Sequence, residues 1–339
     1  MRAIITGVLL AVAPTTAVAA SSSEDTVPAV LAPYLINGVV APGDYRWLRG
    51  RFPGASPHDL EALLAGLKFD EGCVARARTA MAEKLAAMGQ RFDPADGLYA
   101  RSAACRQFTQ LPVGKDVTWE QASAALDRVR PYALGILTAT QLAEEDTLDR
   151  GSFADQLRTR TIGEQVLRKA WTESQRHGGE TASYSPLERT IYEAILLRAL
   201  DERDYANTQW LSGMIAAEGW PSRTAVGDDA SRAAWLLAQH ADADPAFQLR
   251  ALRLMAPLAA RGDVDQVSFA MLTDRVQLKL SGKQRYGTQW TCTSGKRAPQ
   301  PLEADTAATD RARKQVGLDT LAENASRIDA MYGGCLPVR

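Results

Sequence analysis

Residues 204–289 decide the fold of this chain, and they read DYANTQWLSGMIAAEGWPSRTAVGDDASRAAWLLAQHADADPAFQLRALRLMAPLAARGDVDQVSFAMLTDRVQLKLSGKQRYGTQ. Apolar residues recur there at helical spacing, and Asp204 is expected to cap the first helix. Each apolar run stops at a helix-ending or turn residue, such as Gly219, Gly262 or the residues before Pro245. The stretch therefore predicts amphipathic helices that follow one another with tight turns.

The rest of the chain carries the same kind of helix signal. Ser56-Pro57 and Ser185-Pro186 each place a capping serine before a proline at the first helical position. Thr118 and Gln121 form a capping box at the start of a long helix. We expect helices over about 70–88, 153–175, 204–218, 228–241, 245–262 and 264–280, followed by two short helices. At most a short strand or hairpin is expected near 285–293, so the sequence predicts an all-α protein, an irregular helical bundle or array.

Size and charge limit the domain organisation and the partners. A chain of 339 residues suits one large or two modest domains. We expect an N-terminal helical region over 21–150 and a C-terminal helical domain over 151–339. The 39 Lys and Arg residues are balanced by 40 Asp and Glu residues, so the chain lacks the basic surplus of a general nucleic-acid binder. Nucleic acid is therefore not an expected partner.

The first twenty residues have the three parts of a secretory signal peptide. Arg2 gives a positive start, residues 4–13 form an apolar core, and Ala17-Val18-Ala19 is a small-residue cleavage site. The apolar core is too short to span a bilayer, which needs about 20 residues. We therefore expect a periplasmic or secreted protein with no membrane span after signal cleavage.

The chain has four cysteines, and an even number in an exported protein favours disulfides. Pairing by proximity in the sequence gives Cys73–Cys105 and Cys292–Cys335, one bridge in each half of the chain. The alternative, a thiol or metal site, is not favoured because no two cysteines have metal-ligand spacing. Two disulfides are the expectation.

Most motifs of known chemistry are missing. The sequence has no G-x-x-x-x-G-K-[ST] phosphate loop, no H-E-x-x-H, no G-x-S-x-G and no C-x-x-C. It contains only three histidines, which makes a multi-histidine metal site improbable. The expectation is therefore that the protein has no metal site and no cofactor.

Two polar residues interrupt apolar stripes in the C-terminal half. His240 continues the stripe of Leu236 and Leu237. Asp274 falls on the stripe that Val267, Met271 and Leu278 define. A carboxylate on a buried face requires a partner, and both His240 and the adjacent Arg275 are candidates. We expect His240 and Asp274 to face the same interior.

This pair has two interpretations. His240 and Asp274 can hydrogen-bond to each other and fix the helix packing, or they can form a catalytic centre in which His240 carries the proton and Asp274 sets its tautomer. Residues 284–289, QRYGTQ, are dense in hydrogen-bonding groups, which is more typical of a ligand-binding segment than of a simple connecting loop. The residues assigned to ligand binding are Gln239, Arg275, Gln284, Tyr286 and Gln289.

Several short motifs in this part of the chain occur together in a known family. They are GWP at 219–221, VG and DDASRAAWLLAQHAD at 226–242, FQ at 247–248, DR at 274–275, QRYGTQ at 284–289, VGLDTL at 316–321 and MYG at 331–333. Over about 201–334 the sequence resembles a bacterial domain-of-unknown-function family that occurs in exported or lipid-anchored proteins. The resemblance implies export but supplies no activity.

Two functions are compatible with these residues. The first is a periplasmic enzyme that uses acid–base or hydrolytic chemistry on a small polar or anionic molecule, with an activated water as nucleophile. The second is a non-catalytic helical module that binds a peptide, glycan or partner protein. The position of His240 and Asp274 relative to solvent distinguishes the two.

Overall fold

The structure is a computed structural model that describes residues 35–36, 39–40, 71–91, 117–175, 181–293 and 296–332. The elements run in the order β1 (Leu35–Ile36), β2 (Val39–Val40), α2 (Glu71–Ala87), α3 (Trp119–Arg150), α4 (Phe153–Gln175), α5 (Pro186–Glu218), α6 (Arg223–Val226), α7 (Asp228–Gln239), α8 (Pro245–Ala260), α9 (Gln266–Ser281), β3 (Trp290–Thr293), β4 (Lys296–Pro299), α10 (Thr306–Gln315) and α11 (Leu321–Tyr332). The predicted signal peptide, the helix start at Ser56, Cys105 and Cys335 lie outside the described residues.

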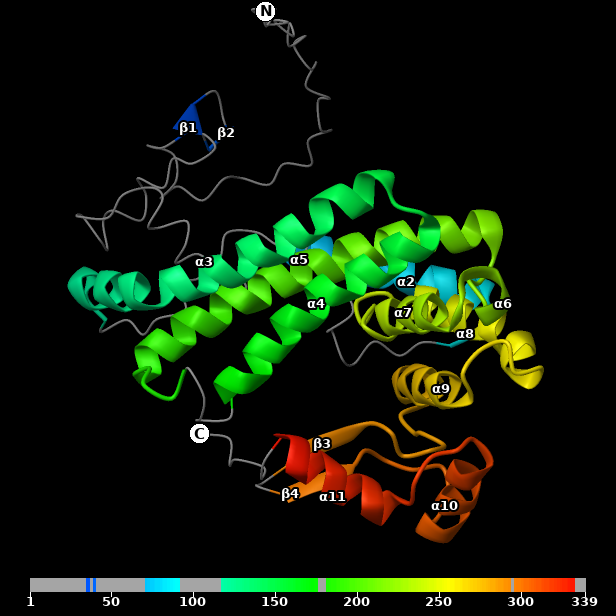
Figure 1. Cartoon of the computed structure of the whole chain (residues 1–339). Helices are drawn as coiled ribbons and strands as arrows, with labels where there is room; N and C mark the ends of the chain where they lie inside the picture. Colours follow the sequence, from blue (N-terminus) through cyan, green and yellow to red (C-terminus); the bar gives the residue numbers. More distant parts are fainter. Residues whose placement is uncertain are drawn as a thin grey trace, which may run out of the picture.

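Helices α3, α4 and α5 lie side by side and form the largest helical layer (Figure 1). They share an apolar core to which α3 contributes Leu126 and Val129, α4 contributes Leu167, and α5 contributes Ile191 and Leu196. Each of these side chains is at most 1% exposed. Burial of such large apolar side chains, at about 1.5–3 kcal/mol each, is what holds the three helices together.

A second apolar core lies between the other end of this layer and α2, α7, α8 and α9. The first half of α4 contributes Leu157 to it, and the last part of α5 contributes Leu211 and Ile215. Met255 on α8 and Leu272 on α9 are fully buried in the same core. Helices α4 and α5 therefore take part in both cores and connect them.

Three of the predicted helix caps are present. Thr118 and Gln121 form their reciprocal hydrogen bonds at the start of α3, and Ser185 makes the same capping box with Glu188 at the start of α5. Asp244 accepts the backbone N–H of Phe247 at the start of α8. These local signals were sufficient to predict where the helices start. A cap satisfies backbone N–H groups within its own helix and needs no distant residue.

One expected helix boundary is wrong. Asp204 does not cap a new helix, because α5 is continuous from Pro186 to Glu218. The buried residues Leu200 and Leu211 continue one apolar face through this position, and Asp204 instead bonds to Arg168 on α4. Tertiary packing thus overrides the local preference of aspartate for helix starts.

The C-terminal elements follow α9. Strands β3 and β4 form an antiparallel hairpin with Trp290 opposite Pro299, and α10 and α11 complete this part of the molecule (Figure 1). The short hairpin and the two final helices are as predicted, and the all-α fold class is confirmed. In the described part of the chain, no helix has the length and apolar character needed to cross a bilayer.

The described part of the chain includes Cys292, on strand β3, which takes part in a disulfide. Its predicted partner Cys335 lies outside the described residues, as does Cys105. The pairings Cys292–Cys335 and Cys73–Cys105 therefore stay predictions. The predicted boundary between two domains near residue 150 also stays a prediction, although α3 shares its core with α4 and α5.

Candidate functional site

His240 lies at the C-terminal end of α7, where the helix backbone must be satisfied by other groups. Its backbone is the C-cap, with φ −92° and ψ 0°. Gln248, fully buried on α8, donates from Nε2 to the carbonyls of Ala238 and Gln239. These carbonyls belong to the last turn of α7, where the regular helical hydrogen bonds end, so Gln248 fixes the end of α7. This contact holds the His240 backbone in place.

The hydrogen-bond partner of the His240 ring is Glu164 on α4. His240 Nδ1 is 2.8 Å from Glu164 Oε1, and the Glu164 side chain is 0% exposed while the His240 side chain is 15% exposed. The expectation that Asp274 orients His240 is therefore wrong. Glu164 and His240 are 76 positions apart, so only the packing of α4 against α7 brings them together.

A second acidic side chain faces α4 from α5. Asp204 Oδ2 accepts a hydrogen bond of 2.5 Å from Nη2 of Arg168, which lies one turn after Glu164 on α4. The side chains of Arg168 and Asp204 are 27% and 22% exposed. Glu164 and Asp204 thus lie on neighbouring helices, with Arg168 as the cation next to both.

On the other side of His240, Asp242 binds two cations from α9. Arg275 Nη1 is 2.5 Å from Asp242 Oδ2, and Lys279 Nζ is 2.7 Å from Asp242 Oδ1. Lys279 also donates to Oε1 of Gln248 at 3.1 Å. Arg275 and Lys279 are one helical turn apart, so both can reach one carboxylate. The Asp242 side chain is 50% exposed, which makes it the most open of these groups.

We name these seven residues the His240 cluster: Glu164, Arg168, Asp204, His240, Asp242, Arg275 and Lys279. The cluster lies where the two apolar cores meet. Along α4, Glu164 falls between Leu157 of one core and Leu167 of the other. Along α5, Asp204 falls between Leu200 and Leu211 in the same way. The cluster is therefore a polar layer inside the fold that reaches solvent at Asp242.

Several buried polar atoms of this layer have no hydrogen-bond partner among the described residues. They are Glu164 Oε2, Arg168 Nε, Asp204 Oδ1 and Arg275 Nε, and the adjacent Gln239 Oε1 shares this property. A buried polar group without a partner costs about 1–3 kcal/mol, so natural proteins contain few of them. Five such atoms lie in or beside the His240 cluster, and others occur elsewhere among the described residues.

The electrostatic environment raises the pKa of one residue of the cluster and lowers the pKa of two others. Burial lowers the pKa of His240, although the hydrogen bond that its ring donates to Glu164 acts the other way. Burial raises the pKa of Asp204 to about 7, against the effect of Arg168. Burial also acts to raise the pKa of Asp242, but Arg275 and Lys279 outweigh it and hold this pKa well below its usual range. At neutral pH the layer therefore combines an uncharged imidazole with a carboxyl group close to its own titration point.

Asp274 has a different role. Its carboxylate is fully buried and accepts three backbone N–H groups, those of Arg285 and Tyr286 at Oδ1 and that of Thr288 at Oδ2. The distances are 2.8–2.9 Å. Asp274 thus contacts residues 284–289 directly. Because both oxygens bind backbone donors, Asp274 fixes the conformation of this loop.

The polar side chains of the same loop are mostly used within it. Gln284 is 0% exposed and bonds to the carbonyls of Gln289 and Gln300 and to the N–H of Gln289. Gln289 Nε2 donates to Thr288 Oγ1. The backbone carbonyl of Tyr286 accepts from Arg313 Nη1, whose side chain is 1% exposed. The loop is therefore a self-contained hydrogen-bonded unit, and a ligand-reading role for Gln284, Tyr286 and Gln289 stays a prediction.

The sequence patterns did not single out Glu164, Arg168, Asp242 or Lys279, and they indicated Asp204 only as a helix cap. A usable signal existed for Glu164, which lies seven residues after Leu157 and three before Leu167 on an apolar stripe. This is the same argument that singled out Asp274. No such signal existed for Asp242 and Lys279, because their importance depends on which face of α9 packs against α7.

In the part of the chain that the structure describes, no group of three or more His, Cys, Asp or Glu side chains is arranged to hold a metal ion. Comparison with curated proteins and with solved structures gave no match. A family model matches residues 190–336, which include His240, Asp242 and Arg275 but not Glu164 or Arg168. The model is that of a family of unknown function (DUF6624), and the match agrees with the resemblance that the motifs predict.

Proposed function

We propose that the protein is an exported enzyme that performs acid–base chemistry on a small anionic molecule, with His240 as the general base. The observation that carries this proposal is the 2.8 Å contact between His240 Nδ1 and the buried Glu164. A carboxylate at one ring nitrogen fixes the tautomer and orientation of the imidazole, and the other nitrogen is then free to take a proton. Glu164 thus has the orienting role that the sequence assigned to Asp274.

The titration of the ring supports this role. Since burial lowers the pKa of His240, the imidazole is neutral at pH 7, and the proton on Nδ1 is the one that Glu164 accepts in a hydrogen bond. Nε2 then carries the lone pair. A base must be unprotonated to act, so the lowered pKa increases the fraction of competent enzyme near neutral pH.

Asp204 is the proposed proton donor. Its pKa of about 7 means that a large fraction of this carboxyl group keeps its proton at neutral pH. In the reaction we propose, His240 Nε2 takes a proton from water, the hydroxide attacks the substrate, and Asp204 gives its proton to the leaving group. A lowered pKa keeps the base unprotonated and a raised pKa keeps the acid protonated at neutral pH, which is the arrangement that a paired base and acid requires.

The cations support an anionic substrate. Arg275 and Lys279 are each 23% exposed, and the Asp242 side chain that neutralises them is 50% exposed. Ion pairs near solvent contribute only about 0–1 kcal/mol. Because Asp242 reaches solvent, a carboxylate or phosphate of the substrate can compete with it for these two cations.

The alternative function is a non-catalytic helical binding module. The observation in its favour is that the cluster joins four helices, because Lys279 on α9 bonds to Asp242 after α7 and to Gln248 on α8, while Glu164 bonds to His240 from α4. A network of this kind stabilises helix packing without any chemistry.

Turnover by active-site variants separates the two functions. We would assay the full chain against a panel of anionic carboxylic esters, amides and phosphoesters, and compare His240→Gln and Glu164→Gln with the matched control Glu83→Gln, which changes an exposed carboxylate on α2. Loss of the base is expected to lower kcat by about 100-fold or more, and loss of the orienting charge by about tenfold or more. Circular dichroism checks that both variants fold.

A pH profile adds an independent readout. The enzyme proposal predicts that Asp204→Asn removes the decline in activity at alkaline pH, where the proton donor is lost. A substrate that His240→Gln converts at the rate of the unchanged protein would exclude His240 as base. Saturable binding without turnover, unaffected by Glu164→Gln, would favour the binding module.

A further inference from the structure

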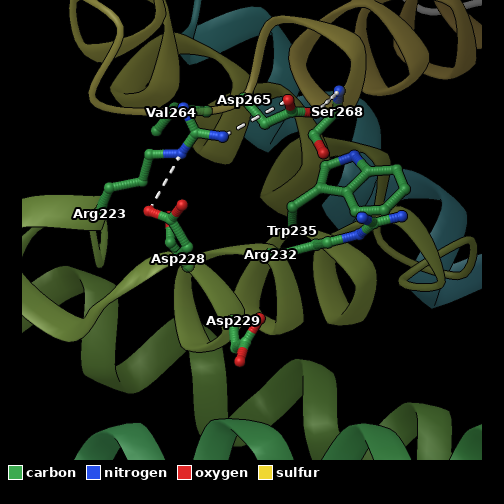
Figure 2. A pocket seen from close by; sticks show the side chains of 9 residues that line it. Arg223, Asp228, Asp229, Arg232, Trp235, Val264, Asp265 and Ser268 are labelled. Atoms are coloured by element: carbon green, nitrogen blue, oxygen red, sulfur yellow. Dashed lines mark hydrogen bonds and ion pairs between the residues drawn. The ribbon is translucent and has the colours of Figure 1, made fainter.

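A pocket of about 190 Å³ lies on the other half of α7, away from the His240 cluster. Figure 2 shows its walls, which come from Arg223 on α6, from α7, and from the first turn of α9. The volume equals that of several water molecules, which is enough for a small ligand. Arg232 and His240 are eight residues apart in the sequence, so the pocket and the cluster are separated by about 12 Å along α7.

The pocket is held open by contacts between α6 and the turn before α9. The backbone N–H of Arg223 donates to the carbonyl of Asp263 at 2.9 Å, and the N–H of Thr224 donates to Asp263 Oδ1 at 2.8 Å. The Arg223 guanidinium lies 3.5 Å from Asp228 and 3.6 Å from Asp265 (Figure 2). These distances exceed those of good hydrogen bonds, so Arg223 and the two carboxylates keep bonding capacity for a ligand.

Trp235 supplies the strongest sign of a ligand. This side chain lines the pocket and is only 7% exposed, yet its indole Nε1–H has no hydrogen-bond partner among the described residues. Tryptophan N–H groups usually find an acceptor when they are buried, because an unsatisfied donor costs about 1–3 kcal/mol. The acceptor that satisfies Trp235 is therefore to be sought in the pocket itself.

Arg232 adds an unpaired positive charge. It lies one turn before Trp235 on the same face of α7, and it makes no hydrogen bond or ion pair with another described residue. Arg232 and Trp235 therefore offer the pocket a guanidinium and an indole N–H, two donors that the two oxygens of a carboxylate can accept.

The aspartates that line the pocket indicate which charge the other end of the ligand carries. Asp228 lies one turn before Arg232, on the same side of α7. The lining contains the arginines Arg223 and Arg232 and three aspartates, Asp228, Asp229 and Asp265, so a multiply charged anion would meet a net negative wall. A ligand with one carboxylate and one cationic group matches this distribution.

We propose that this pocket binds a small zwitterion of the α-amino acid class. The ligand carboxylate accepts from Trp235 Nε1 and Arg232, and its ammonium group binds Asp228. The pocket residues Asp228, Ser231 and Trp235 belong to the stretch DDASRAAWLLAQHAD that carries the family resemblance, and the proposed catalytic chemistry uses only the last part of it.

Calorimetric titration of the full chain with the free amino acids tests the proposal, followed by derivatives of the one that binds best. The N-acetyl derivative lacks the cationic group, the amide lacks the carboxylate, and the α-hydroxy analogue replaces the ammonium with a neutral donor. Each derivative is expected to bind at least about tenfold more weakly than the parent, since each loses one charge-assisted contact.

Variants locate the site. Arg232→Gln and Trp235→Phe are expected to weaken binding by about tenfold or more, whereas the exposed Arg311→Gln on α10 serves as the matched control and leaves it unchanged. Asp228→Asn is paired with Asp229→Asn, because Figure 2 shows the Asp229 carboxylate apart from the other labelled side chains. Arg232 is exposed, so its substitution does not threaten folding.

The outcomes are distinct from those of the enzyme proposal. His240→Gln is expected to leave amino acid binding unchanged, so failure of one proposal does not carry over to the other. Absence of saturable binding by all free amino acids would overturn the pocket proposal. Binding that survives both Arg232→Gln and Trp235→Phe would place the ligand elsewhere, and equal binding of the N-acetyl derivative would exclude recognition of the ammonium group.

Discussion

Glu164 and Asp274 make an instructive comparison, because both are fully buried carboxylates on helices whose other inward residues are apolar. Asp274 is saturated, with three backbone N–H donors on its two oxygens. Glu164 uses only one oxygen, since Oε1 contacts His240 Nδ1 and accepts from Gln165 Nε2, while Oε2 has no partner among the described residues. Both carboxylates are equally buried, but Asp274 has hydrogen-bond partners on both oxygens and Glu164 has them on only one.

We propose that this difference separates a structural carboxylate, Asp274, from a functional one, Glu164. A buried charge that is fully hydrogen-bonded contributes to stability, and its removal leaves donors without acceptors. A buried charge that is only partly satisfied is a cost to the folded state. Its presence in a fold of ordinary marginal stability is best explained by a role in binding or chemistry. On this criterion the Asp274 loop is a structural unit and the His240 cluster is the candidate site.

Removal of the Asp274 carboxylate should give the largest loss of stability. Asp274→Ala leaves the N–H groups of Arg285, Tyr286 and Thr288 without their acceptor, so we expect a loss of about 3–5 kcal/mol in the free energy of unfolding. Urea denaturation followed by circular dichroism measures this loss, with the exposed Asp127→Asn on α3 as control. A loss below about 1 kcal/mol would contradict the structural role of Asp274.

Arg313 fixes the same loop from the opposite side, and its removal should rank second. It donates to the carbonyls of Tyr286 and Gly287 and to Asp319, and it is almost fully buried. Arg313→Met keeps much of the volume but removes the donors, at a cost of about 2–4 kcal/mol. If the loop is one unit, the double variant with Asp274→Ala should lose less than the sum of the two single losses. Strict additivity would show that the two contacts act independently.

Asp204 should produce a pH-dependent effect in the His240 cluster. Its folded-state pKa of about 7 is above its unfolded value, so the folded state binds the proton more tightly between these two values. The contribution of Asp204 to stability is therefore greatest at low pH and is lost as the pH rises through about 7. Relative to Asp204→Asn, the stability of the unchanged protein should fall over pH 4–7, by at most about 1.4 kcal/mol per pH unit. Parallel pH profiles for the two proteins would contradict the raised pKa.

Glu164→Gln should have the smallest effect on stability. The amide keeps the shape of the side chain and removes a charge whose second oxygen is unsatisfied, so we expect a change below about 1 kcal/mol in either direction. This result, combined with the loss of activity predicted for the same variant, is the signature of a functional carboxylate. Thermal and urea unfolding measure it, and a loss comparable to that of Asp274→Ala would place Glu164 among the structural residues.

The sequence by itself determined the helices, because the signals that define them are local. The serine–proline starts, the capping boxes and the glycines at helix ends act within a few residues, and α4, α7 and α8 occur close to where their patterns place them. The same locality gave the Asp274 loop, which begins at the end of the helix that carries Asp274. Residues 11 to 14 positions apart were enough to define this contact.

Only the tertiary structure decided the partners of the candidate site. Asp204 has the local character of a helix cap, yet it lies inside α5 and binds Arg168, 36 positions away. Glu164 reaches His240 across 76 positions, and Arg275 turns to Asp242 rather than to its sequence neighbour. The physical reason is that a helical stripe shows which residues point inward, whereas the identity of the opposing residue depends on how the helices cross and slide against one another.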